Sequence, residues 1–208
     1  MYKYPKTLHL PWSPGISKQD KILKDTNDFI NKNIVLTEKM DGENTTIDSN
    51  HYHARSLDSS DHESQHWLKN ELSKIQYLIP KGYRICGENL YAKHSIFYNK
   101  LYSYFMVFSI WNGNVCLSWE HTKIMCEKLG LRTVPVRYEG KFNELELRNL
   151  NYPNSRCGLE AEGYVIRNYE EFLFEDFNKN VAKYVREGHV QTDKHWKNQK
   201  IIKNQIGG

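Results

Sequence analysis

The chain has 208 residues, of which 39% are hydrophobic and 26% are charged, and its formal net charge at pH 7 is +4. This length suits a single domain with a substantial core. The charge permits a nucleic-acid partner without requiring one, since a local basic patch matters more than the total. No apolar run approaches the roughly 18 residues of a membrane-spanning helix, so the composition excludes an integral helical membrane protein.

The termini and the cysteines indicate where such a chain would reside. The first residues lack the apolar region of a secretory signal and the character of a transit peptide. The four cysteines form no C-x-x-C pair, which is typical of neither a disulfide framework nor a zinc ribbon and suits a reducing compartment. We therefore expect a cytoplasmic protein with no membrane partner.

The first half of the chain predicts two strands and a helix. Strands are expected at 34–38 and 44–47, with Asp41-Gly42 as the turn between them. A helix is expected from a cap at Ser60-Asp61 to about Leu78, because apolar residues recur there at helical spacing.

The second half predicts more strands than helices. The run at 104–111 is nearly continuously apolar, which predicts a central strand covered on both faces. The other expected elements are a strand at 83–87, a hairpin turn at Asn112-Gly113 into 115–117, helices at 119–130 and 142–149, and strands at 163–167 and 181–185. The mixture predicts an α+β fold of mostly antiparallel sheets, in one domain over residues 1–208.

The segment from Thr37 to Gly42 carries the first chemical signal. Lys39 stands at a strand end, two residues before Asp41-Gly42, and the glycine would let a phosphate approach closely. A lysine becomes a nucleophile when desolvation or neighbouring positive charge lowers its pKa. Alone, K-x-D-G is a weak pattern, and a solvent-exposed lysine beside a hairpin turn is the simpler interpretation.

An ordered series of further motifs follows Lys39. They are Arg55-Ser56, Gly87 to Tyr91, Phe105 to Ile110, Glu162 to Arg167 and Val181 to Arg186. In this order and at these intervals they resemble the motif series of the covalent nucleotidyltransferases, and most closely the compact ATP-dependent RNA ligases of bacteria and phages. The resemblance spans residues 39–186, within a core of about 34–190. It implies a nucleotidyltransferase domain of mostly antiparallel sheets flanked by helices, in a bacterial or phage-infected host.

The resemblance also implies a role for each motif residue. Lys39 would attack the α-phosphorus of ATP, expel pyrophosphate and hold AMP as a lysyl phosphoramidate. Glu38 would lie against the adenine edge, and Phe108 would stack on adenine. Arg55 would engage ATP or the RNA 5′-phosphate, and Lys183 would contact the α-phosphate. Glu88 would bind the ribose or a metal, and Glu162 would organise the metal. Asp41, Glu88 and Glu162 are hard oxygen donors that suit Mg²⁺ or Mn²⁺.

Two features depart from the family's pattern. The last motif usually carries two basic residues one apart, whereas here Lys183 is followed by a cation only at Arg186. On a strand these two side chains point to opposite faces. Either a bulge brings Arg186 round to the nucleotide, or another group such as Arg167 supplies the second cation. Only 22 residues follow Arg186, too few for an OB domain. The basic tail at 194–208 is expected to be either a helix packed on the domain or an arm that touches RNA.

A second motif points to a different chemistry. His62-Glu63-x-x-His66 matches the zinc-peptidase pattern, with Glu63 as the base, but Lys69 and Leu72 stand where the extended signature needs Gly and His. A zinc peptidase is therefore the remote alternative.

The favoured interpretation is an ATP- and Mg²⁺- or Mn²⁺-dependent RNA ligase that joins 5′-phosphate and 3′-hydroxyl ends, with a possible end-healing kinase/phosphatase partner. The alternatives are a ligase of DNA or hybrid nicks, and a non-catalytic domain of the same fold that binds nucleotide or RNA.

Overall fold

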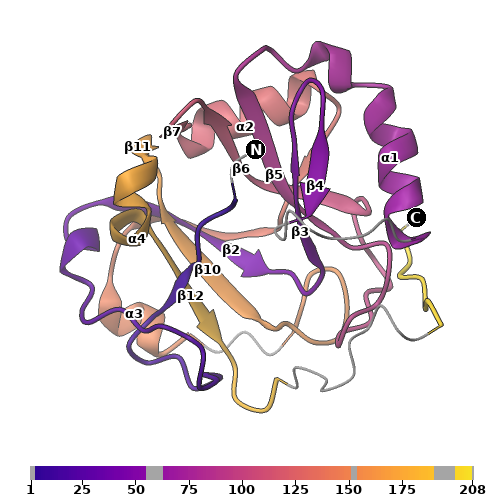
Figure 1. Cartoon of the computed structure of the whole chain (residues 1–208). Coiled ribbons are helices and arrows are strands. Elements are labelled where there is room, and N and C mark those ends of the chain that lie inside the picture. Colours follow the sequence, from indigo (N-terminus) through magenta and orange to yellow (C-terminus); the bar gives the residue numbers. More distant parts are fainter. Residues whose placement is uncertain (1–2, 55–62, 151–153, 190–199, 208) are drawn as a thin grey trace.

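The computed structural model describes residues 3–54, 63–150, 154–189 and 200–207, and its strands form two sheets (Figure 1). The first sheet has five strands, in the order β1 (Leu8–His9), β12 (Val181–Val185), β10 (Gly163–Asn168), β2 (Asn33–Lys39) and β9 (Val136–Lys141). Adjacent strands of this sheet run antiparallel, except for β1 and β12, which run parallel to each other.

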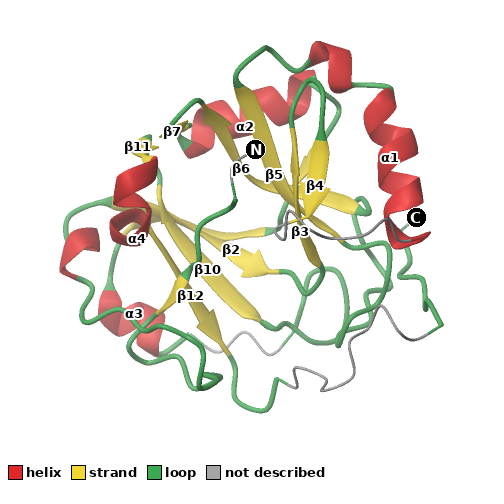
Figure 2. Cartoon of the chain, in the orientation of Figure 1, coloured by secondary structure: helices red, strands yellow, loops and turns green. Residues whose placement is uncertain are grey.

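The second sheet has seven strands. Their order is β11 (Phe172–Leu173), β7 (Val115–Cys116), β6 (Phe105–Asn112), β5 (Tyr83–Asn89), β3 (Glu43–Ile47) and β4 (Tyr52–Ala54), with β8 (Arg132–Thr133) parallel beside β6. The helices are α1 (His66–Ser73), α2 (Trp119–Lys128), α3 (Glu144–Arg148) and α4 (Phe177–Asn180). Figure 2 shows these helices on the outer sides of the strands. The expected α+β, mostly antiparallel architecture is confirmed.

Strands β2 and β6 are buried on both faces, and each lies between two neighbouring strands of its sheet. In β2, Ile34 and Leu36 pack under α3, whereas Val35 points the other way, into the core between the sheets. In β6, Val107 packs toward α1 and α2, and Met106 faces the core that it shares with Val35. The apolar run at 104–111 therefore forms the doubly covered strand that its composition predicts.

The expected hairpin between 34–38 and 44–47 is wrong, because the two strands belong to different sheets. Strand β2 pairs with β9 and β10, whereas β3 pairs with β4 and β5. Gly42 lies in the crossing between the sheets, where a Cβ atom would stand 2.5 Å from the carbonyl oxygen of Asn89. The glycine is needed for this close backbone approach and not for a two-residue hairpin turn.

The helical predictions are confirmed in part. Helix α2 begins after Ser118, whose Oγ accepts a hydrogen bond from the His121 amide, and Gly130 follows it with a φ of +67°. The helix expected up to Leu78 is shorter, since α1 ends at Ser73 and single 3₁₀ turns flank it at Glu63–Gln65 and Gln76–Leu78. Its expected cap at Ser60-Asp61 lies outside the described residues.

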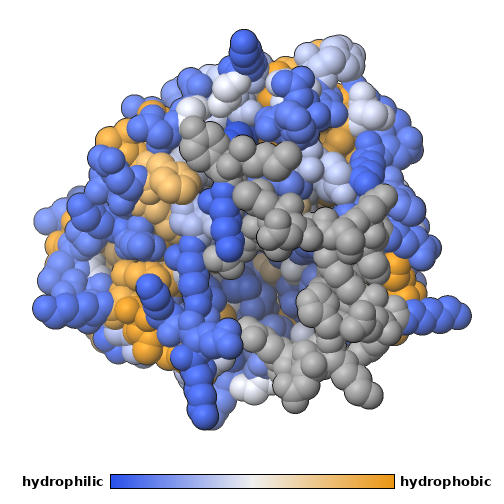
Figure 3. All heavy atoms as spheres, in the orientation of Figure 1, coloured by the Kyte–Doolittle hydropathy of each residue, from blue (hydrophilic) through white to orange (hydrophobic). Residues whose placement is uncertain are grey.

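The described end of the chain packs on the body of the domain. Residues 200–207 are extended, and bridges join Lys203 to Ala92 and Ile206 to Leu101. The tail helix is therefore not found over these residues, and 194–199 lie outside the described part. No helix in the described ranges combines the length and apolar character of a membrane span. On the face in Figure 3 the described side chains are mostly hydrophilic.

Candidate active site

A pocket of about 420 Å³ opens where the two sheets meet. Its walls come from β2, β5, β6, β10 and β12, and from the N-terminal residues 4–7, which run between the sheets (Figure 1). Five of the residues to which the resemblance assigns a role line it, namely Glu38, Lys39, Glu88, Phe108 and Lys183.

Lys39 lies at the end of β2 and forms a close ion pair. Its Nζ is 2.6 Å from Oε1 of Glu162, and the two side chains are 25% and 7% exposed. Glu162 directly precedes Gly163, which is the register partner of Lys39 in the β2–β10 pair. Burial by itself lowers the pKa of Lys39, but the negative charges of Glu162 and Glu88 outweigh it and raise the pKa above its ordinary value. Lys39 is therefore a half-buried, ion-paired cation in this state, and not a solvent-exposed lysine.

Glu88 lines the same pocket from β5. Burial raises its pKa to about 8, although the charge of Lys39 opposes this shift. Glu88 is therefore mostly protonated at neutral pH, which suits hydrogen bonding to a sugar hydroxyl, whereas ligation of a cation would require loss of this proton.

Glu38 and Phe108 meet the pocket in different ways. Oε2 of Glu38 accepts a hydrogen bond from the Arg156 amide and lies 3.2 Å from Nη2 of Arg137, whereas Oε1 is buried with no hydrogen-bond partner among the described groups. The half-buried ring of Phe108, in β6, has the Tyr4 ring edge-on at a centroid distance of 5.1 Å. An aromatic wall thus stands at the end of the pocket where Tyr4 enters.

Lys183 reaches the pocket from β12 and is held by an acidic neighbour. Its Nζ is 3.6 Å from Oδ1 of Asp20, whose Oδ2 accepts hydrogen bonds from the amide and hydroxyl of Ser17 and lies 3.5 Å from Nε2 of His9. Burial, and then the nearby charge of Lys39, lower the pKa of Lys183. Lys39 and Lys183 therefore concentrate positive charge at one place, as the binding of a phosphate chain requires.

The arginines considered for the second cation have other partners. Arg186 donates to the Ala161 carbonyl and lies 2.6 Å from a Glu160 oxygen. Arg167 lines the pocket, but its Nη2 donates to the Leu117 carbonyl at 2.6 Å. Arg55 lies outside the described residues.

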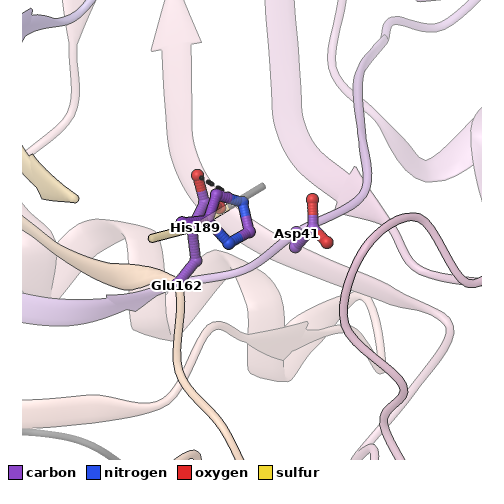
Figure 4. A group of neighbouring side chains, drawn as sticks. All are labelled: Asp41, Glu162 and His189. Carbon is purple, nitrogen blue, oxygen red and sulfur yellow. Dashed lines mark ion pairs between the residues drawn. The ribbon is translucent and has the colours of Figure 1, made fainter. Parts of the chain in front are cut away.

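A group of potential metal ligands (Figure 4) includes Glu162, the ion-pair partner of Lys39. Asp41, Glu162 and His189 each offer one ligand atom, and these atoms lie within 4.8 Å of one another. Two of the three expected metal ligands thus stand together, whereas Glu88 is outside this group. His62 lies outside the described residues, and neither Glu63 nor His66 belongs to the group that the described ranges contain.

Sequence reasoning missed Asp20, His9 and His189 as site residues. Asp20 lies in an irregular segment and His9 in the two-residue strand β1, where neither has a periodic pattern around it, and only the fold brings them to Lys183. His189 belongs to the segment after the last motif, where the resemblance to the ligases is weaker.

Comparison with known proteins identifies the family of this chain. The family model for RNA ligase matches residues 32–185, which is most of the chain. The chain belongs to the RNA ligase family. No curated protein sequence matches it significantly.

Solved RNA ligases share the fold of this family member. A Naegleria gruberi RNA ligase with PPi superimposes with a TM-score of 0.61 at 18% identity, over 88% of this chain and 60% of that one. A variant of the same ligase with ATP and Mn gives 0.59 at 15%, over 90% and 62%. An archaeal ATP-dependent RNA ligase gives 0.59 at 18%, over 89% and 48%. The chain thus spans about half to three fifths of the length of these proteins.

Proposed function

We propose that this chain is an ATP-dependent RNA ligase, in a single nucleotidyltransferase domain, that works through a covalent lysyl-AMP on Lys39. The observation that carries the proposal is the position of Lys39, which lies in a pocket between two sheets beside a second lysine, a carboxylate and an aromatic wall. A phosphate chain and a purine need these groups, since phosphoryl chemistry depends mostly on positioning and charge neutralisation.

In the first step, Lys39, which is a cation beside Glu162 before ATP binds, gives one proton to solvent, and the resulting neutral amine attacks the α-phosphorus of ATP. A P–N bond forms, the bond to the bridging oxygen breaks, and pyrophosphate leaves with its electron pair, while the second proton of the amine passes to solvent. Lys183 would neutralise the α-phosphate, and Phe108 would hold the adenine face. Asp41 and Glu162 would hold a Mg²⁺ or Mn²⁺ ion, which supplies charge neutralisation when bound.

The two later steps use the same pocket. An oxygen of an RNA 5′-phosphate attacks the phosphorus of the bound AMP, and the P–N bond breaks to return Lys39 as an amine. An RNA 3′-hydroxyl then attacks the activated 5′-phosphorus, a phosphodiester forms and AMP leaves. A kinase/phosphatase that prepares 5′-phosphate and 3′-hydroxyl ends is the partner that this chemistry calls for.

The proposal is tested by labelling. The protein is incubated with α-labelled ATP and Mg²⁺ or Mn²⁺, and stable label is measured on the wild type, on Lys39→Ala and on Lys141→Ala, a control at an exposed lysine of β9. We expect label on the wild type and on the control, and none on Lys39→Ala. Intact mass shows whether the purified protein already carries AMP.

Two results would contradict the proposal. Absence of label from an AMP-free wild type favours a non-catalytic nucleotide-binding domain. Labelling followed by sealing of nicked DNA in preference to nicked RNA favours the DNA or hybrid ligase.

A further inference from the structure

Three separate segments bring Asp41, Glu162 and His189 to one point (Figure 4). Asp41 follows β2, Glu162 precedes β10, and His189 follows β12 after Gly188, whose φ of +69° turns the chain. The ligand atoms of the three lie within 4.8 Å of one another. This spacing allows one small cation to contact all of them.

The Asp41 carboxylate is held in a fixed orientation. Its Oδ2 accepts hydrogen bonds from the amides of Ser95 and Ile96, at 2.7 and 2.8 Å, and its own amide donates to the Tyr98 hydroxyl at 2.9 Å. A ligand whose rotamer is already fixed loses little freedom when a cation binds.

The Glu162 carboxylate has one committed oxygen and one without a partner. Oε1 faces Lys39 at 2.6 Å and Nε2 of His189 at 3.5 Å. Oε2 is buried and accepts no hydrogen bond from any described group. A buried oxygen left unpaired is costly, and a cation would remove that cost without displacing Lys39 from Oε1.

His189 makes the site different from a carboxylate-only magnesium site. Its side chain is only 4% exposed, and its imidazole lies against Glu162 inside the group. Mg²⁺ prefers oxygen ligands and retains its waters, whereas imidazole favours first-row transition metals. We propose that Asp41, Glu162 and His189 bind a divalent first-row transition-metal ion directly, in preference to Mg²⁺. This inference rests on the proposed function for its role in catalysis, but the binding is testable without ATP.

The test uses Mn²⁺ as the probe, because it is paramagnetic. The full chain is labelled with ¹⁵N only at histidine, and pulsed EPR measures coupling between Mn²⁺ and nitrogen. Mn²⁺ and Mg²⁺ affinities are measured by titration and competition on the wild type, His189→Gln, His189→Asp and His51→Gln, a control at an exposed histidine. A melting curve shows that each variant is folded.

We expect ¹⁵N coupling in the wild type and in His51→Gln, and its loss in His189→Gln. Mn²⁺ affinity should fall at least about tenfold in His189→Gln, with a much smaller change for Mg²⁺. In His189→Asp, which restores an oxygen ligand, the preference for Mn²⁺ over Mg²⁺ should shrink.

Absence of ¹⁵N coupling in the wild type would overturn the inference, as would equal losses of Mn²⁺ and Mg²⁺ affinity in His189→Gln. Adenylylation is measured separately on the same samples. A wild type that is adenylylated but shows no coupling would refute this site alone, and one that shows coupling but no adenylylation would refute the ligase proposal alone.

Discussion

At the scale of single residues, Asp20 sets the position of Lys183. Asp20 is itself fixed by two hydrogen bonds from Ser17 and lies 3.6 Å from the lysine Nζ. Burial raises the pKa of Asp20, but the Ser17 bonds and the Lys183 charge outweigh it and lower the pKa to about 2. Asp20 is therefore a positioning residue that acts through Lys183.

Replacing Asp20 by Asn should slow adenylylation, because Lys183 is still present but loses the ion pair that positions it. We expect a rate loss of about five- to tenfold, which corresponds to one partly exposed ion pair, against about 100-fold for Lys183→Ala. Rates are measured in single turnover with labelled ATP. The matched control is Asp176→Asn, whose ion pair with Lys179 lies on the surface, and it should leave the rate unchanged. An equal loss in both Asp variants would contradict the positioning role.

The pKa of His9 predicts an acid-dependent loss of stability. Burial and then the Lys183 charge lower this pKa from 6.5 to about 4, although Asp20 opposes the shift. Below about pH 6.5 the unfolded chain binds a proton that the folded chain refuses, so the unfolding free energy falls as the pH drops from 6.5 to 4. The loss should approach about 3 kcal/mol.

Urea unfolding at several pH values measures this loss. His9→Gln should flatten the slope between pH 6.5 and 4 relative to the wild type. Because a substitution at a buried residue also affects folding, the pKa of His9 in the wild type is measured directly by NMR titration as a second test. A midpoint near 6.5 would refute the prediction.

Four of the residues that the sequence identified share one property. Lys39, Glu88, Phe108 and Lys183 are on strands whose apolar patterns can be recognised locally, and Asp41 and Glu162 lie close to strand ends. In contrast, the contacts that join Asp20 to Lys183 and His189 to Glu162 depend on loop conformation. No local pattern encodes those contacts.

At the scale of elements, the apolar strands were predictable but their partners were not. The short Asp41-Gly42 segment resembles a hairpin turn, yet it carries the chain from one sheet to the other, because long-range pairing decided the outcome. Strand β9 is not predicted from the sequence, since Val136–Lys141 has no strong apolar run and its residues are all half-buried or exposed. It nevertheless forms the edge beside β2.

Gly163 tests the β10–β12 pairing that holds Glu162 and Lys183 in place. An added Cβ atom would stand 2.0 Å from the carbonyl oxygen of Tyr184, so Gly163→Ala must push the two strands apart. We expect a loss of about 3 kcal/mol in unfolding free energy, measured by urea denaturation. Gly113→Ala is the control, because its φ is +57° but no atom lies within 4 Å of the added group, and it should cost about 1 kcal/mol. Similar losses in both variants would contradict the steric argument.

At the scale of the whole molecule, the net charge of +4 hides an uneven distribution around the pocket. Lys6, Lys39 and Lys183 all line it, and they come from segments far apart in the sequence. Lys6 and Lys183 both form an ion pair with Asp20, and Lys6 is the more exposed of the two, with a side chain 40% exposed. The carboxylates of Asp20, Glu38 and Glu88 line the pocket as well, so under the proposed function an RNA 5′-phosphate that reaches Lys39 would meet these lysines as a local positive path with Lys6 at its rim.

This distribution predicts that RNA binding depends steeply on salt and that Lys6 contributes one phosphate contact. The affinity for a 5′-phosphorylated RNA strand, measured by fluorescence anisotropy, should fall along a straight line in log–log coordinates between 50 and 200 mM salt. Lys6→Ala should weaken binding severalfold and make the slope shallower by about 0.7, the value for one single-strand contact. Lys141→Ala removes the same charge from an exposed position on β9, away from the residues that line the pocket, and should leave the slope unchanged. If both lysine variants changed the slope equally, the effect would reflect total charge and not the field at the pocket. The local field is then distinguished from the total charge by the difference between two otherwise equivalent substitutions.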